Sequence, residues 1–210
     1  MLKYKKDNKK YICRNEGFGL IFTGDINTEE TNLIPVEIET LINPMGDFDS
    51  CICFWHPVDL FSLVNTAIKA VECKGEENDY FCWEAFGDSY RKVFRYRPDS
   101  GVYFEIIKES ILGMTTMEDY YSLLISIQDK DPECEDIYHK CVFIPKLEEY
   151  DMINLIMCVG SFVKDNYDEA AAEEIASQLF SAERWAEGSE IKDFTERFEK
   201  FCENYEHEIF

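Results

Sequence analysis

Apolar and polar residues alternate in parts of the first half of the chain, which is the period of a strand with one buried face. The alternation is clearest over residues 33–42, where Asn43-Pro44 then breaks the pattern. Residues 18–23 form an apolar, β-prone run, and residues 51–55 are apolar on both faces, as in a strand covered on both sides. The pattern therefore predicts several strands in this region.

The clearest hairpin signal is the turn sequence PDSG at 98–101, which separates the β-prone segments 90–97 and 102–107. A helix is expected to begin at Pro57, because a missing N–H costs nothing in the first turn of a helix. Apolar residues then follow at helical spacing until Gly75 ends the pattern: Leu60, Phe61, Val64, Ala67, Ile68 and Val71.

The second half of the chain carries mainly helical patterns. Thr115 and Glu118 predict a capping box for a helix over residues 120–127, which would end before Pro132. A short strand is expected over residues 141–144 and three further helices over residues 147–165, 168–187 and 190–206. The last of these is the most regular, with a stripe at steps of three and four: Ile191, Phe194, Phe198, Phe201 and Tyr205.

These elements predict an α+β fold with an N-terminal, mostly antiparallel sheet, one helix packed on that sheet, and a mainly helical C-terminal half. Residues 1–112 would form a sheet-rich region and residues 113–210 a helix-rich region. A single continuous domain is the alternative, since no hinge rich in Gly, Ser or Pro marks the division. The chain has 210 residues and 31 aromatic side chains, enough for a sizeable core.

The cysteines and the apolar runs indicate a cytoplasmic protein. Nine cysteines, an odd number without regular spacing, favour free thiols in a reducing compartment. Cys158, inside the apolar run 152–163, and Cys202, beside the phenylalanine stripe, are expected to be core thiols. That run is also the longest apolar one, and it is shorter than the roughly 18 residues that a membrane span needs. We therefore expect no membrane association.

Charge is the strongest compositional feature, with 43 acidic and 21 basic residues and a formal net charge of −22. Residues 1–100 contribute −5 and residues 101–210 contribute −17. One interpretation is that the acidic surface only keeps the protein soluble. The other is that it steers a cationic partner toward the protein, and direct binding of nucleic acid is then disfavoured by repulsion from the phosphates.

The best candidate binding surface is an acidic face on the C-terminal helices. Carboxylates recur there every three to four residues, so they would stand about 5–6 Å apart on a helix. This density is comparable to that of the phosphates of duplex DNA, which proteins that neutralise nucleases can exploit. The candidate residues are Glu173, Glu174, Glu183, Glu187, Glu190, Asp193, Glu196, Glu199 and Glu203.

Two groups of basic residues are prominent against this background. The N-terminal group resembles a solvated arm, which could also clamp an acidic partner: Lys3, Lys5, Lys6, Lys9 and Lys10. The second group, Arg91, Lys92, Arg95 and Arg97, is interleaved with aromatic residues along one strand of the predicted hairpin. In a strand, the three arginines would share one face, and Lys92 would share the other face with Phe94 and Tyr96. Such interleaving can bind single-stranded nucleic acid. Pairing of these arginines with carboxylates inside the protein is the stronger alternative.

No catalytic or metal-binding signature is present. Cys134, His139 and Cys141 form C-x4-H-x-C, and Cys51 with Cys53 forms C-x-C, whereas zinc usually requires pairs at C-x2–4-C spacing. A phosphate-binding glycine loop, a Gly-x-Ser-x-Gly turn and a His-Glu-x-x-His motif are all missing from the sequence. We therefore assign no catalytic residue, no metal ligand and no cofactor.

The sequence favours a non-enzymatic binding or inhibitor protein that presents a negative surface to a basic protein partner. Such a protein would be immunity-like or anti-defence-like, or would mimic nucleic acid. The alternative is a small intracellular enzyme of unknown reaction that uses a thiol or carboxylates in a pocket. A deep pocket with convergent polar groups would favour the enzyme, and a broad negative face would favour the binding protein.

Overall fold

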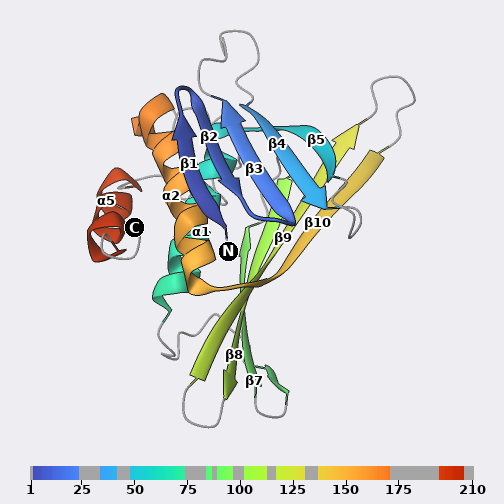
Figure 1. Cartoon of the computed structure of the whole chain (residues 1–210), viewed down its shortest axis with the longest axis vertical. Coiled ribbons are helices and arrows are strands. Elements are labelled where there is room, and N and C mark those ends of the chain that lie inside the picture. The colour runs from blue at the N-terminus through green and yellow to red at the C-terminus, as the bar shows by residue number, and fades with distance from the viewer. Residues whose placement is uncertain are drawn as a thin grey trace.

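The computed structural model describes nine segments of the chain: residues 2–23, 34–41, 48–73, 84–86, 89–96, 102–112, 117–130, 137–170 and 194–205. Within them, two antiparallel sheets and three helices alternate along the sequence (Figure 1). The predicted α+β class is therefore confirmed. None of the helices in the described segments is long and apolar enough to cross a membrane.

Sheet A is formed by the first five strands, each paired antiparallel with the next along the chain. In spatial order they are β1 (Lys3–Asp7), β2 (Lys10–Arg14), β3 (Phe18–Thr23), β4 (Ile34–Leu41) and β5 (Phe48–Trp55). In β4, Ile34, Val36 and Ile38 are buried while Glu37 and Glu39 are partly exposed, which confirms the predicted alternation.

Sheet B repeats this order with the next five strands. They are β6 (Glu84–Phe86), β7 (Ser89–Tyr96), β8 (Val102–Leu112), β9 (Met117–Lys130) and β10 (Ile137–Leu147). The predicted hairpin is formed by β7 and β8, and the short strand predicted at 141–144 lies inside β10.

A helix follows each sheet: α1 (Pro57–Glu72) comes after sheet A and α2 (Glu149–Asn166) after sheet B. Both begin in the same way, because the third helical residue is an aspartate whose carboxylate accepts the backbone N–H of the N-cap residue. The distances are 2.9 Å from His56 to Asp59 and 3.0 Å from Glu148 to Asp151. The two halves thus share one topology, five strands and a capped helix, although the sequence contains no visible repeat.

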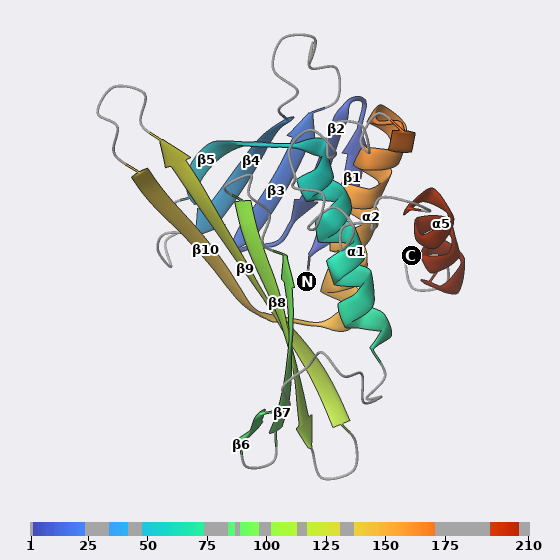
Figure 2. The same cartoon turned by 180° about the vertical axis from the view of Figure 1, so that it is seen from behind.

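Each of these two helices packs on the sheet of the other half. Helix α1 packs on β7 and β8 of sheet B, while α2 packs on β1 and β2 of sheet A, and α1 and α2 lie side by side (Figures 1 and 2). The third helix, α5 (Phe194–Tyr205), lies at the outer edge of the molecule beside α2 in both views. Each half therefore depends on the other to bury its apolar face.

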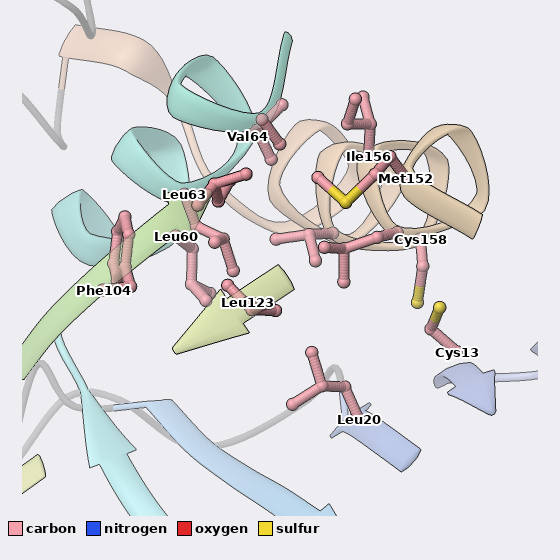
Figure 3. Close-up of a cluster of buried hydrophobic side chains, with 14 of the residues drawn as sticks. Cys13, Leu20, Leu60, Leu63, Val64, Phe104, Leu123, Met152, Ile156 and Cys158 are labelled. Atoms are coloured by element: carbon pink, nitrogen blue, oxygen red, sulfur yellow. The ribbon is translucent and has the colours of Figure 1, made fainter. Parts of the chain in front are cut away.

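The core lies between the sheets and the helix pair. Leu20 of β3 and Leu123 of β9 approach it from the two sheets, and Leu60, Leu63 and Ile156 approach it from the helices (Figure 3). Trp55 stacks on Phe104 across the sheets with ring centroids 6.3 Å apart. Burial of such side chains stabilises the fold by about 1.5–3 kcal/mol each.

Of the two cysteines expected to be core thiols, Cys158 belongs to the core and Cys202 packs against it. Cys158 is fully buried, and its sulfur points toward that of the buried Cys13 (Figure 3). Burial raises the pKa of the Cys158 thiol, and its hydrogen bond with Cys13 raises it further. Cys202 is partly buried and packs against the core beside the phenylalanine stripe.

The helix predicted over residues 120–127 is wrong, because these residues belong to strand β9. Tyr121, Leu123 and Ile125 are fully buried, whereas Ser122 and Leu124 between them are partly exposed. This is a period of two rather than 3.6. β9 also pairs with β8 on one side and β10 on the other, so its backbone groups are satisfied by neighbours that are distant in sequence.

The N-terminal lysines do not form a solvated arm. Lys3, Lys5 and Lys6 lie on β1, Lys10 begins β2, and Lys9 lies in the tight turn between these strands, so the segment is a hairpin at the edge of sheet A. The side chains of all five are exposed, as expected. Lysines on an edge strand also discourage pairing with a further strand.

The described residues after Leu147 form helices, as predicted. Helix α2 matches the expected helix 147–165, and α5 matches the regular part of the expected helix 190–206. Of the expected helix 168–187, the structure describes residues 168–170 alone. The proposed division near residue 112 stays a prediction, and β8 and β9 pair with each other across it.

Candidate functional site

The candidate acidic surface that the structure describes is on α5. Phe194, Phe198 and Phe201 are buried on one side of this helix, and Phe194 packs edge-to-face on Phe61 of α1 at 4.7 Å. These rings fix the helix against α1 and α2, because apolar residues at spacings of three and four share one face.

The opposite side of α5 presents exposed carboxylates. Glu196, Glu199 and Glu203 all face solvent there, and we refer to these three residues as the α5 acidic face. Glu199 forms an exposed ion pair of 2.6 Å with Lys164 of α2. Lys200, the next residue after Glu199, is also exposed, so one basic side chain lies beside the acidic ones. The remaining six candidate residues lie outside the described residues: Glu173, Glu174, Glu183, Glu187, Glu190 and Asp193.

The N-terminal end of α5 is positioned by another carboxylate. The Glu169 side chain accepts the backbone N–H of Thr195, which belongs to the first turn of α5. A negative charge at this end complements the partial positive charge of the helix N-terminus. The position of α5 is therefore set by polar contacts as well as by its buried rings.

Several basic side chains of the described residues form ion pairs with carboxylates. Lys6 pairs with Asp165 at 2.7 Å, and Tyr11 donates a hydrogen bond to the same carboxylate. Burial alone would raise the pKa of Asp165, but these two hydrogen bonds more than offset it and hold the pKa below its usual value. Arg14 pairs with Glu39 and Arg91 with Glu109. These pairs bring cations from the N-terminal hairpin and from β7 into the protein's own charge network.

The predicted face separation of the basic strand is confirmed where its side chains are described. Arg91 is exposed and pairs with Glu109 directly opposite on β8, while Lys92 and Phe94 are buried. Arg95 lies opposite Glu105 in the same register. Internal pairing, the stronger of the two alternatives, is thus confirmed for Arg91.

A hollow of about 1100 Å³ lies where the end of sheet A meets β10. Lys3, Lys5 and Arg14 reach it from β1 and β2, and Phe143 reaches it from β10 with 56% of its surface exposed. Within the described residues its lining includes one carboxylate, that of Glu16, and neither a cysteine nor a histidine. This lining lacks the thiol and the base that a cysteine nucleophile needs.

The cysteine and histidine combinations considered for metal binding fall partly outside the described residues and side chains. No group of three His, Cys, Asp or Glu side chains with metal-binding geometry occurs in this part of the chain. Cys141 is exposed on β10, and Cys134 lies outside the described residues. His56 is the N-cap of α1, and burial lowers its pKa.

Sequence reasoning missed a cluster at the C-terminal end of α1. Lys92 and Lys108 are both buried there, opposite each other on β7 and β8, and both contact Cys73. The strand pattern contained a signal, since Lys92 alternates in step with Phe94 and Lys108 with Ile106. Lysines are rarely buried, so their positions alone favoured an exposed interpretation.

Comparison with protein-family models, curated proteins and solved structures finds no match for this chain.

Proposed function

We propose that this protein is a non-enzymatic binding or inhibitor protein that engages a basic protein partner through its negative surface, of which the α5 acidic face is the described part. The observation that carries the proposal is the placement of Glu196, Glu199 and Glu203 on the exposed side of a helix whose other side is fixed in the core. The net charge of −22 acts in the same direction.

A fixed acidic helix suits recognition for two physical reasons. Carboxylates held on a packed helix need little further ordering on binding, so less of the interaction energy is lost. A large net charge also accelerates the encounter with an oppositely charged protein. Lys6, Arg14 and Arg91 are each paired with a carboxylate of the same chain, so these cations present less positive charge to a partner.

The proposed partner is a basic protein such as a toxin, a nuclease or a defence factor, and the proposed location is the cytoplasm. Immunity and anti-defence roles both fit, because each requires a protein that masks the cationic surface of another. Nucleic-acid mimicry is the form that this would take if the partner normally binds phosphates. We favour binding over an enzyme because the described hollow combines cations and apolar groups without a thiol–base pair.

The test is affinity capture from a lysate of the native cell with three versions of the full chain. One is the wild type, and one carries Glu196→Gln, Glu199→Gln and Glu203→Gln. The matched control removes three exposed carboxylates elsewhere: Glu16→Gln, Glu72→Gln and Glu118→Gln. Captured proteins are identified and quantified by mass spectrometry.

We expect the wild type and the control to retain the same basic protein, and the α5 variant to retain roughly tenfold less of it, as expected for the loss of several exposed charge pairs. Equal retention by all three versions would show that the α5 acidic face has no part in binding. Retention of an acidic or neutral partner would contradict the charge-based proposal itself.

A further inference from the structure

The C-terminal end of α1 meets sheet B at two buried lysines. Lys92 is 2% exposed and Lys108 is 7% exposed, and the two are directly opposite each other on β7 and β8. A buried ammonium group is costly unless it is paired. The contacts of these two lysines must therefore compensate two neighbouring positive charges.

Lys108 has well-defined partners. Its Nζ lies 2.8 Å from the carboxylate of Asp119 and donates a hydrogen bond of 2.8 Å to the backbone carbonyl of Cys73. Cys73 is the C-cap of α1, where backbone carbonyls carry the negative end of the helix dipole. Asp119 in turn accepts a hydrogen bond from Ser110.

Lys92 is directed at a sulfur atom. Its Nζ lies 2.6 Å from Sγ of Cys73, so the amine and the thiol group are in direct contact. Cys73 as a residue is only partly buried. Reactive cysteines occupy such positions: electropositive and partly exposed.

A third group marks the site as unusually polar for a core. The hydroxyl of Tyr121 is buried and has no hydrogen-bond partner among the described residues, and Nζ of Lys108 lies 5.5 Å from the centre of its ring. Burial raises the pKa of Tyr121, and the nearby charges of Glu149 and Asp119 add to the effect.

We propose that Cys73 and Lys92 form a peroxide-sensitive pair in which oxidation joins Sγ to Nζ covalently. The thiolate of Cys73 attacks hydrogen peroxide: an S–O bond forms, the O–O bond breaks, and hydroxide leaves, which gives a sulfenic acid. The hydroxide takes a proton from the Lys92 ammonium and becomes water. The free amine then displaces the hydroxyl group from sulfur, and a proton of the amine leaves with it as a second water. One peroxide is consumed and an S–N bond, a sulfenamide, is formed.

The link would fasten the C-terminal end of α1 to β7 of sheet B. Two equivalents of an external thiol would reverse it, because they return the Cys73 thiol and the Lys92 amine and leave as a disulfide. The contact between the two groups is what selects this product. A cysteine that contacts a hydroxyl group, such as the exposed Cys141 beside Ser126, would instead proceed to sulfinic and sulfonic acids.

The test uses the reduced full-length chain, treated with hydrogen peroxide, alkylated and then digested for mass spectrometry. We expect a linked species that joins the peptides of Cys73 and Lys92 at a mass about 2 Da below their sum, and its disappearance after treatment with excess thiol. Cys141 in the same sample measures the reaction of an ordinary exposed thiol. Cys73 oxidised to acids while Lys92 stays free would overturn the proposal, as would an unreacted Cys73 beside an oxidised Cys141.

Two lysine variants test whether the link needs the nucleophilic amine of Lys92 or only its positive charge. Lys92→Arg keeps a cation beside Cys73 but removes the nucleophilic amine, so Cys73 should be oxidised to acids without a link. Lys108→Arg leaves Lys92 in place and should still form the link. A link that persists in Lys92→Arg would show that another residue is the acceptor. The wild-type measurement decides the question even if either variant fails to fold.

Discussion

Gly160 of α2 lies beneath the ring of Phe198, and the two helices can approach each other there because this position has no side chain. A Cβ atom at Gly160 would lie 2.2 Å from Cε2 of Phe198, and two further ring atoms would lie within 2.7 Å. Phe198 belongs to the buried stripe that fixes α5. The absence of a side chain at residue 160 therefore allows α5, and with it the α5 acidic face, to pack closely on α2.

Replacing this glycine tests how α5 is held. In an isolated helix Gly→Ala stabilises by about 1 kcal/mol, but overpacking a core costs about 1–3 kcal/mol. We expect Gly160→Ala to lower the free energy of unfolding by roughly 1–2 kcal/mol in urea titrations, because a ring in a packed stripe cannot simply rotate away. Gly17→Ala is the control, since its nearest neighbour would be Oδ1 of Asn15 at 3.9 Å. A Gly160→Ala variant more stable than the wild type would refute this packing of α2 against α5.

His56 gives the protein a defined dependence on pH. Burial lowers its pKa in the folded state, while in the unfolded state it stays near about 6.5. The unfolded chain therefore binds a proton at His56 more readily than the folded chain does. The contribution of neutral His56 to stability is present above about pH 6.5 and is lost as the pH falls below it. We expect this loss in urea titrations between about pH 7 and 5, and expect His56→Gln to reduce it. An identical pH profile for the variant would remove His56 as the cause.

At the scale of elements, the sequence predicted those whose period was unambiguous. α1 begins at Pro57 as expected, β3 has the expected bounds, and α2 contains the whole apolar run 152–163. β9 was mistaken for a helix because Leu123 and Leu124 are adjacent and apolar, which a short helical window accepts as readily as a strand. Its partners β8 and β10 decided the outcome, and pairing of that kind cannot be read from one segment.

The candidate site was less predictable than the fold. The stripe of Phe194, Phe198 and Phe201 correctly placed α5, and thereby Glu196 and its neighbours on the exposed side. The crossing of α1 onto sheet B and α2 onto sheet A could not be derived, because it depends on contacts between the two halves. For the same reason the meeting of Cys73 with Lys92 was not predictable: the two residues belong to different elements.

Two adjacent leucines distinguish a strand from a helix in β9. Leu123 is fully buried and Leu124 is partly exposed on the other face of the sheet. We expect Leu123→Ala to lower the free energy of unfolding by about 2–5 kcal/mol and Leu124→Ala by less than about 1.5 kcal/mol. Adjacent side chains point about 100° apart on a helix but to opposite faces of a strand, so equal losses in thermal or urea unfolding would contradict the strand assignment.

At the scale of the whole molecule, charge is unevenly divided. The described residues contain 22 of the 43 acidic residues and 17 of the 21 basic ones, so most of the net charge of −22 is carried elsewhere in the chain. The described body also has a cationic edge, since the hairpin of β1 and β2 carries six basic residues and one acidic residue. The molecule therefore has one positively charged edge and a negative net charge.

This polarity leads to a prediction about nucleic acids. The local cations of β1, β2 and β7 are partly paired, whereas the total charge repels phosphates over about 10 Å at 0.1 M salt. We expect no binding of single-stranded or duplex DNA or of RNA by the isolated protein in filter-binding experiments at moderate salt. Tight binding that is lost on Arg91→Gln would instead assign a nucleic-acid role to β7.

The central claim is that negative charge brings this protein to a basic partner, and its most direct test is the salt dependence of the association rate. The protein captured in the affinity experiment is mixed with the wild-type chain in stopped-flow measurements between about 0.05 and 0.5 M salt. We expect the association rate to fall steeply with salt, and the Gln variant at Glu196, Glu199 and Glu203 to start lower and fall less. An association rate that is the same at both ends of this range would contradict the claim.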